Sequence, residues 1–301
     1  MKSEKELFFP PRGFAGILPP YTDWERALVV ILPVPYDSTT EWRSGTRDGP
    51  RAIIDASQYL ELYDFELDQE IYKVGIHTLP EIQPVMSSPE DMIDRVYNTA
   101  KTLVNEGKLV VMLGGEHSLT LGMVKAFVDR FLGLSVLQLD AHADLRDEYF
   151  GTKYSHACVM RRVFELCPLV QVGVRSLSWE EQQFLNQNKM KSPYVSTLTT
   201  EPDCVEHVIS QLSKDVYVTI DLDAFDPSLM PAVGTPEPGG LGWQEAVNLL
   251  KVVARKRRVV GFDIVELCPR EGPTSCAFLA AKLAYKFIGY ITLKERGWEV
   301  A

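Results

Sequence analysis

The alternation of short apolar runs with longer segments of helical period constrains the fold most. Several apolar runs are almost uninterrupted, which is typical of strands covered on both faces of a parallel sheet. The expected strands are 27–34, 109–113, 134–140, 170–174, 216–223 and 259–266. The expected helices are 89–106, 119–131, 178–188, 202–212 and 243–257. Ser178 followed by Glu181 predicts a capping box at the third of these helices. The pattern predicts an α/β domain with a mostly parallel sheet.

Composition narrows the class of protein. The chain has 301 residues, of which 46% are hydrophobic and 24% are charged, so it can bury a sizeable core and is not mainly disordered. Its formal net charge of −10 argues against a general nucleic-acid binder and weakly favours a cationic substrate. Because no long linker or internal repeat interrupts the alternation, we expect one domain over residues 1–301.

Cysteine usage and the apolar segments bear on location. The five cysteines are odd in number, form no CxxC pair and lie in or beside apolar runs, which predicts reduced thiols in the cytoplasm. Residues 1–18 are charged and interrupted by prolines, unlike a signal peptide. The run 276–293 carries Lys282 and Lys286 at helical spacing, which indicates a packed amphipathic helix. We therefore expect no membrane partner.

Polar side chains follow three of the predicted strands. The run 134–139 leads into Asp140, His142 and Asp144, and in an extended chain these alternate residues would point to one side. Two further segments have the same character, 216–220 followed by Asp221 and Asp223, and 109–113 followed by two glycines and His117. The carboxyl ends of parallel strands meet at one edge of a sheet, where such folds place their sites.

Two imidazoles and four carboxylates in one place predict a metal centre. Without cations, the crowded carboxylates would repel one another and take up protons. An oxygen-rich set with some nitrogen and no thiolate suits two Mn²⁺ ions better than a structural zinc site. Paired ions typically lie about 3.5–4 Å apart and lower the pKa of a bridging water towards ~7, which yields a hydroxide for attack on an electrophilic carbon. Singly, each Asp could be a turn former and each His a core residue; Asp226 before Pro227 is interpreted as a turn residue, and Glu116 as a supporting one.

Four segments resemble the ureohydrolase family, which comprises the arginases and agmatinases. They are GGEHS (114–118), DAHAD (140–144), DLDAFDPSLMPAVGTPEPGGL (221–241) and GFDIVE (261–266). Residues 35–37 and 45–51 are similar to the family's N-terminal loop, so the resemblance covers most of the chain in family order. It implies a three-layer α/β/α fold of the arginase and deacetylase type. It also implies an amidinohydrolase that uses two Mn²⁺ ions and a metal-bridging hydroxide to release urea from a guanidino group.

The resemblance also assigns roles to single residues. One metal would be held by His117, Asp140, Asp144 and Asp221, and the other by Asp140, His142, Asp221 and Asp223. Asp144 would help to orient the attacking oxygen. Glu266 matches the carboxylate that binds the substrate guanidinium, although a buried ion-pair partner is the alternative interpretation. His156 matches the histidine that delivers a proton to the leaving amine, and its unperturbed pKa of ~6.5 suits that task.

The neighbours of His156 depart from the family pattern. Ala157 and Cys158 stand where agmatinases more often have Gly-Thr, which predicts a narrower pocket or a changed loop. A histidine that only hydrogen-bonds is the alternative interpretation of His156. The 147–156 segment lacks the Gly-Asn-Leu-His-Gly run that arginases have after the DxHxD motif, and it is closer to agmatinases. Glu237 also fits the agmatinase sequence pattern.

The predicted substrate is agmatine, cleaved to putrescine and urea in cytoplasmic polyamine biosynthesis. The acidic Asp147 and Glu148 would suit its distal ammonium. N1-aminopropylagmatine, guanidinobutyrate, guanidine and arginine remain alternatives. A deacetylase is more distant because the chain has no His-His pair, and a non-catalytic regulatory homologue is an alternative of another class. The resemblance implies a homotrimer or homohexamer.

Overall fold

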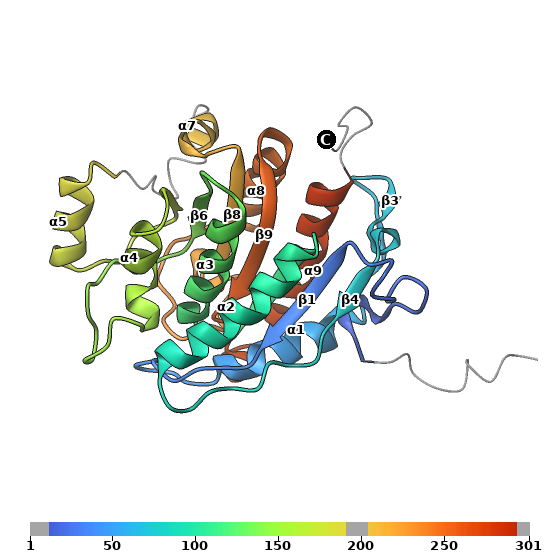
Figure 1. Ribbon diagram of the computed structural model, residues 1–301, viewed down its shortest axis with the longest axis horizontal. Coiled ribbons are helices and arrows are strands. Elements are labelled where there is room, and N and C mark those ends of the chain that lie inside the picture. The colour runs from blue at the N-terminus through green and yellow to red at the C-terminus, as the bar shows by residue number, and fades with distance from the viewer. Residues whose placement is uncertain (1–11, 191–203, 294–301) are drawn as a thin grey trace, which may run out of the picture.

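A parallel sheet of seven strands forms the centre of the computed structural model, which describes residues 12–190 and 204–293 (Figure 1). Its spatial order is β4-β1-β5-β9-β8-β6-β7. The strands are β1 (Val29–Val34), β4 (Ile76–Thr78), β5 (Leu109–Gly114), β6 (Ser135–Leu139), β7 (Leu169–Val172), β8 (Asp215–Asp221) and β9 (Arg258–Val265). A separate antiparallel pair consists of β2 (Tyr63–Asp64) and β3 (Gln69–Glu70).

Helices cover both faces of the sheet. One face packs against α2 (Pro89–Asn105), α3 (Thr120–Arg130), α4 (Val159–Phe164) and α5 (Trp179–Gln187). The other packs against α1 (Gly49–Ser57), α7 (Cys204–Gln211), α8 (Trp243–Lys256) and α9 (Ser275–Thr292). Figure 1 shows α2 in front of the sheet and α9 behind it. Successive residues of β1 enter opposite cores, Val29 one and Val30 the other, which explains why the strands are apolar throughout. The predicted three-layer α/β/α fold is confirmed.

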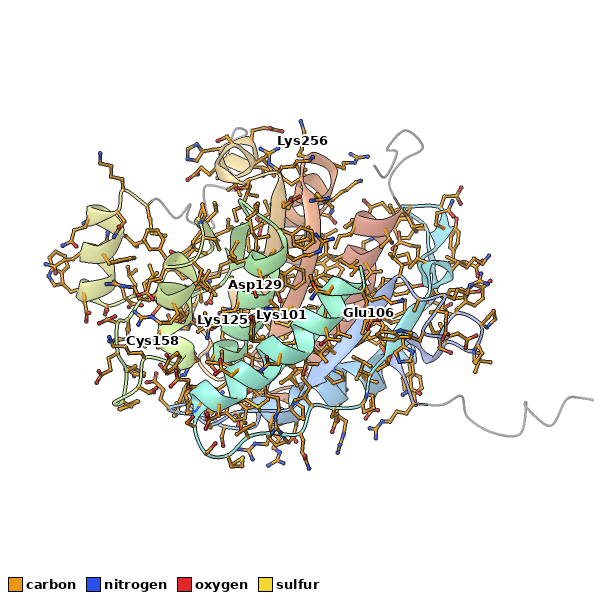
Figure 2. The ribbon with its side chains drawn as sticks, viewed as in Figure 1. Lys101, Glu106, Lys125, Asp129, Cys158 and Lys256 are labelled. Carbon is orange, nitrogen blue, oxygen red and sulfur yellow. The ribbon has the colours of Figure 1, made fainter. Side chains whose placement is uncertain are left out.

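Close packing joins α2 to α3. A Cβ atom at Gly122 of α3 would lie 2.5 Å from the Ile93 carbonyl oxygen of α2, so only glycine allows the helices to approach this closely. On the outer side, Lys101 Nζ lies 2.7 Å from Asp129 Oδ2, and Figure 2 labels both residues there. Because this ion pair is exposed, it contributes little, and the buried contacts hold the helices together.

The predicted elements are all present among the described residues, with shifted ends. The six expected strands correspond to β1, β5, β6, β7, β8 and β9, and the capping box of Ser178 and Glu181 begins α5. The helix expected over 202–212 is described from Cys204 to Gln211, and its first two expected residues lie outside the described residues. The sequence analysis missed α1, α4, β4 and the pair of β2 and β3. Apart from α1, these elements are six residues long or shorter, too short for a periodic pattern.

The apolar run near the C-terminal end of the described chain forms α9. Lys286 of this helix is buried, and its Nζ lies 2.9 Å from Asp64 Oδ2 and 2.8 Å from Glu66 Oε2. Within the parts of the chain that the structure describes, no helix is long and apolar enough to cross a membrane. All five cysteines are buried and free.

Candidate functional site

Neighbouring strands bring the predicted site residues together. His117 lies three residues beyond β5, Asp140 directly follows β6, Asp221 ends β8, and Glu266 directly follows β9. These four strands are neighbours in the order β5-β9-β8-β6, and all are parallel. Their carboxyl ends therefore share one edge of the sheet, as predicted.

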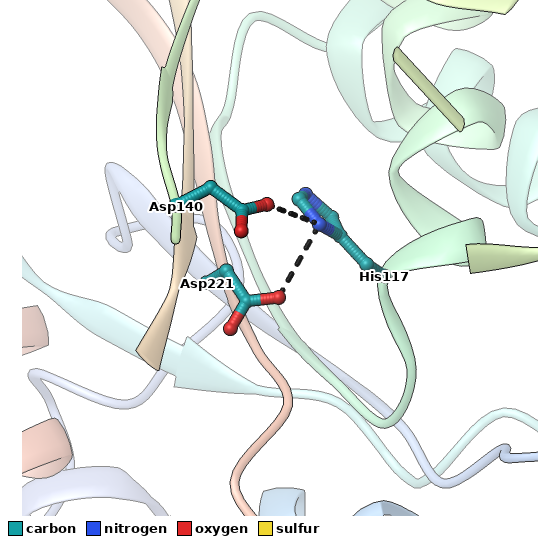
Figure 3. Close-up of side chains that lie close together, drawn as sticks. All are labelled: His117, Asp140 and Asp221. Atoms are coloured by element: carbon teal, nitrogen blue, oxygen red, sulfur yellow. Dashed lines mark ion pairs between the residues drawn. The ribbon is translucent and has the colours of Figure 1, made fainter. Parts of the chain in front are cut away.

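Three carboxylate oxygens surround one imidazole nitrogen. His117 Nδ1 lies 3.1 Å from Asp140 Oδ2, 3.1 Å from Asp144 Oδ2 and 3.4 Å from Asp221 Oδ2. Figure 3 shows the ring of His117 facing two of these carboxylates, Asp140 and Asp221. All four residues are buried, and Nδ1 has no hydrogen-bond partner among the described residues.

The other nitrogen of His117 explains why Nδ1 is unpaired. Nε2 lies 2.9 Å from Thr219 Oγ1, and this hydroxyl donates its proton to Asp263 Oδ1 at 2.6 Å. Because a threonine hydroxyl has a single proton, Thr219 must accept from Nε2–H. With Nε2–H donating to Thr219, only a proton or a cation at Nδ1 offsets the three carboxylate oxygens that face it. Burial favours the neutral ring, but these carboxylates outweigh it and raise the pKa of His117 well above its ordinary range. A divalent cation satisfies all four atoms, so the residues present fit a metal ion.

A second group of possible ligands adjoins the first. His142 Nδ1 lies 2.8 Å from Asp223 Oδ2 and 3.7 Å from Asp140 Oδ1. Asp140 thus presents Oδ2 to the first group and Oδ1 to the second. Both groups have ligand atoms close enough to one another to hold an ion.

The electrostatics of the cluster are those of a site that takes up cations. Burial raises the pKa of Asp221 and Glu266 well above the usual range, and nearby carboxylates add to the effect. Burial, together with the Asp140 charge, raises the pKa of Asp144 to about 7. For His142, burial favours the neutral ring, but the carboxylates of Asp223 and Asp140 outweigh it and raise the pKa. Without a metal, the cluster therefore retains protons that divalent ions would displace.

The local backbone differs from the extended chain on which the sequence argument relied. Asp144 has φ 53°, in the left-handed region, and Asp223 lies in the 3₁₀ turn η7 (Leu222–Ala224). Glu266 also has a positive φ, 65°. Such conformations are costly for residues other than glycine and gather at functional sites. Turns, rather than strand alternation, therefore bring these side chains to the cluster.

A cavity of about 300 Å³ opens over the cluster. All the predicted site residues line it except Asp140, which lies beneath. Glu266 Oε1 accepts a hydrogen bond of 2.6 Å from the backbone N–H of His117, which fixes this carboxylate beside the cluster. Ala157 also lines the cavity.

His156 lies at the start of the 3₁₀ turn η6 (His156–Cys158) and faces the same cavity. Its Nδ1 is 3.1 Å from Thr39 Oγ1. Burial lowers its pKa to about 4, so the ring is neutral at pH 7. The unperturbed pKa of about 6.5 expected from the sequence does not hold at this partly buried position.

The acidic residues at the mouth of the cavity are not the ones expected. Neither Asp147 nor Glu148 lines it, and Asp147 Oδ1 lies 2.6 Å from Arg162 Nη2 instead. Glu41 and Glu237 line it. The sequence analysis gave no role to Glu41, Thr39, Thr219 or Asp263. Asp263 lies within the quoted segment 261–266, and the other three lie beside quoted segments, which is the only signal that could have found them.

Comparisons with known proteins identify the family. The family model described as "Arginase family" matches residues 27–289. An N(1)-aminopropylagmatine ureohydrolase from Synechocystis is 38% identical, over 89% of this chain and 90% of that protein. An agmatinase from Pyrococcus horikoshii is also 38% identical, over 94% of this chain and 98% of that protein. The crystal structure of agmatine ureohydrolase from Thermoplasma volcanium matches with a TM-score of 0.86 and 33% sequence identity. The match covers 96% of this chain and 97% of that one. With the cluster and its cavity, these matches establish that the chain belongs to the arginase family and is a ureohydrolase.

Proposed function

We propose that this ureohydrolase cleaves agmatine to putrescine and urea with two Mn²⁺ ions, as one domain over residues 1–301. The observation that carries the proposal is the buried, unpaired Nδ1 of His117, which faces three carboxylate oxygens within 3.4 Å. Either a proton or a metal cation must lie between this nitrogen and the carboxylates, and the surrounding donors are mainly oxygen, which suits Mn²⁺ as that cation.

The proposed ligands divide into two overlapping sets. One ion would take His117, Asp140, Asp144 and Asp221, and the other Asp140, His142, Asp221 and Asp223. The two oxygens of Asp140 face different groups, which supports its role as a bridge. Paired divalent ions, when bound, activate water and stabilise the negative charge that develops during attack.

The protein side chains orient the substrate and move the proton. Glu266 would receive the planar guanidinium in a bidentate contact, and Asp144 would orient the attacking oxygen. One C–O bond forms at the guanidino carbon and one C–N bond breaks. Because His156 is neutral at pH 7, it can accept a proton at Nε2 and deliver it to the departing amine. The products are urea and an amine, and His156 returns to its starting state.

The charges at the mouth of the cavity support a cationic tail. Arg43 Nη1 lies 3.2 Å from Glu271 Oε2, and its guanidinium lies 4.1 Å from the ring centroid of Trp42. Arg146 lies 4.8 Å from the ring centroid of Tyr149. These two cations are therefore engaged. Glu41 and Glu237 also have partners, since Glu41 Oε2 accepts from the Tyr149 hydroxyl and Glu237 Oε1 lies 3.8 Å from His142 Nε2, but both line the cavity as carboxylates that suit an ammonium.

N1-aminopropylagmatine is a second candidate substrate. It has two ammonium groups beyond the guanidinium, and the mouth offers two carboxylates, Glu41 and Glu237. The Synechocystis relative is named for this activity, which also favours it. We further propose a cytoplasmic homotrimer or homohexamer that serves polyamine biosynthesis, and light scattering of the purified protein tests the assembly.

Urea release by the manganese-loaded protein tests the activity. We expect kcat/KM for agmatine or N1-aminopropylagmatine to exceed that for arginine, guanidinobutyrate and guanidine by about 100-fold or more, because each poorer substrate lacks a distal ammonium, or adds a carboxylate, opposite Glu41 and Glu237. The ratio between the two preferred compounds decides which is the substrate. Preference for one of the other compounds would contradict the cationic-tail argument. No urea from any compound, with two metals bound, would favour a non-catalytic role.

A further inference from the structure

The loop after β1 is fixed against the loop after β5. The backbone N–H of Glu116 donates to the Tyr36 carbonyl at 2.9 Å, and that of Gly115 donates to Val34 at 3.0 Å. A Cβ atom at Gly115 would lie 1.8 Å from the Tyr36 carbonyl oxygen, so only glycine permits this approach. The contact places Ser38 and Thr39 directly over the side chain of Glu116.

The carboxylate of Glu116 is fully buried and collects four donors. Its Oε2 accepts from the backbone N–H groups of Ser38 at 2.6 Å and Thr39 at 2.7 Å. Its Oε1 accepts from the hydroxyls of Thr39, at 2.8 Å, and Ser118. Four donors reach the two oxygens of Glu116 and leave no neighbouring acceptor for a proton of its own, so Glu116 takes the single proton of the Thr39 hydroxyl.

With its proton given to Glu116, the Thr39 hydroxyl can only accept elsewhere. Two groups of His156 lie at 3.1 Å from Oγ1, its backbone N–H and its ring Nδ1. The backbone N–H donates to one lone pair, and Nδ1 must donate to the other. The neutral ring then carries its proton on Nδ1 and its lone pair on Nε2.

We propose that Thr39 is a positioning residue that holds His156 in the Nδ1–H tautomer, with Nε2 free to receive the proton from the reaction. This inference rests on the proposed function, because it assigns Nε2 to proton transfer. Glu116 accepts a hydrogen bond from the Thr39 hydroxyl, and this hydroxyl accepts hydrogen bonds from both the backbone N–H and the ring of His156. The turn at residues 156–158 thereby presents one defined nitrogen to the cavity.

Replacement of the hydroxyl by a methyl group tests the proposal. Thr39→Val keeps the shape of the side chain and removes its donor and both acceptor positions. We expect kcat for the preferred substrate to fall by about 10- to 100-fold, as is typical for loss of a group that orients a catalytic imidazole, with KM within about threefold. Thr39→Ser should restore kcat to within a few-fold of wild type. Ser38→Ala is the matched control, because the Ser38 hydroxyl bonds to Tyr36 and not to Glu116 or His156.

A double-mutant cycle separates positioning from folding. In a His156→Asn background, Thr39→Val should cause no further loss of kcat, since the residue acts through the imidazole. Bound manganese and Tm, measured on all variants, report on folding, and Thr39→Ala replaces Thr39→Val in the cycle if the latter does not fold. An equal loss of kcat with and without His156, or wild-type kcat in Thr39→Val, would overturn the inference alone. Absence of urea release by the wild-type protein would instead overturn the proposed function.

Discussion

A threonine hydroxyl has one proton, and at two positions beside this cluster a buried carboxylate takes it. Thr219 donates to Asp263 and so accepts from Nε2 of His117. Thr39 donates to Glu116 and so accepts from Nδ1 of His156. The same chemistry leaves opposite nitrogens available, Nδ1 towards the proposed metals in one ring and Nε2 towards the cavity in the other. Small uncharged residues thus decide what each imidazole can do.

At Thr219 the expected readout is metal affinity. Thr219→Val removes the acceptor of His117 Nε2–H, which releases the ring orientation, so we expect manganese affinity to fall by about 10- to 100-fold. Thr219→Ser should retain most of it, because the hydroxyl remains. Competition with a chelator measures the affinity of both variants. Unchanged affinity in Thr219→Val would show that the ring is held by its packing alone.

Among the elements, α5 supports the site through Glu181, the same residue that closes the capping box at the start of the helix. Glu181 Oε2 accepts from the Ser178 backbone N–H at 2.7 Å, which closes the capping box. Its Oε1 accepts from the backbone N–H of Leu145 at 2.9 Å. Leu145 directly follows Asp144, so the first turn of α5 supports the strained residue that faces His117.

Glu181→Ala tests this support. We expect the free energy of unfolding to fall by roughly 2–4 kcal/mol, from the lost cap and the unpaired buried N–H of Leu145. Urea denaturation measures the loss, and kcat should fall as Asp144 moves. Glu180→Ala is the matched control in the same turn, and because Glu180 is exposed we expect a change within about 0.5 kcal/mol. Equal effects from the two substitutions would contradict the role of Leu145.

Over the whole molecule, the burial of so many acidic groups at one sheet edge makes stability depend on cations. In the metal-free protein the pKa of Asp144 is raised to about 7, and burial raises those of Asp221 and Glu266 well above their usual range. A carboxyl group with a raised folded-state pKa stabilises the fold below its ordinary pKa, and that stability is lost as pH rises through the raised value. Bound cations reverse the balance, since deprotonated ligands bind them better.

As pH rises, the melting temperature of the metal-free protein should therefore fall, and the stabilisation by added metal should grow. From pH 6.5 to 8.5, we expect the Tm of chelator-treated protein to fall, and the increase in Tm on adding Mn²⁺ to grow to about 5 °C or more. His156, whose pKa is lowered to about 4, adds stability as pH rises, and most of this opposite effect is complete near pH 7, at the lower end of the range. Differential scanning calorimetry across this range measures both trends. A metal-free Tm that is constant or rises would contradict the raised pKa values.

The sequence by itself determined the fold class and the chemical nature of the site. Continuous apolar strands and intervening helices predicted the layered sheet, because a strand that is buried on both faces is apolar at nearly every position. The polar residues at strand ends predicted the cluster, since parallel strands bring their carboxyl ends to one edge. These features depend on residues near one another in the chain or on a general rule of sheet topology.

Only the tertiary structure decided the contacts between loops. Thr39 lies 117 positions from His156, and Thr219 lies 102 positions from His117, so no local pattern could pair them. The sheet order places β9 between β5 and β8, although it comes last among the strands, and this order sets which loops meet. Turns with positive φ then aim Asp144 and Glu266 inward. Packing energy summed over the whole sheet holds these strained turns, and the sequence alone did not reveal which distant hydroxyl each imidazole would contact.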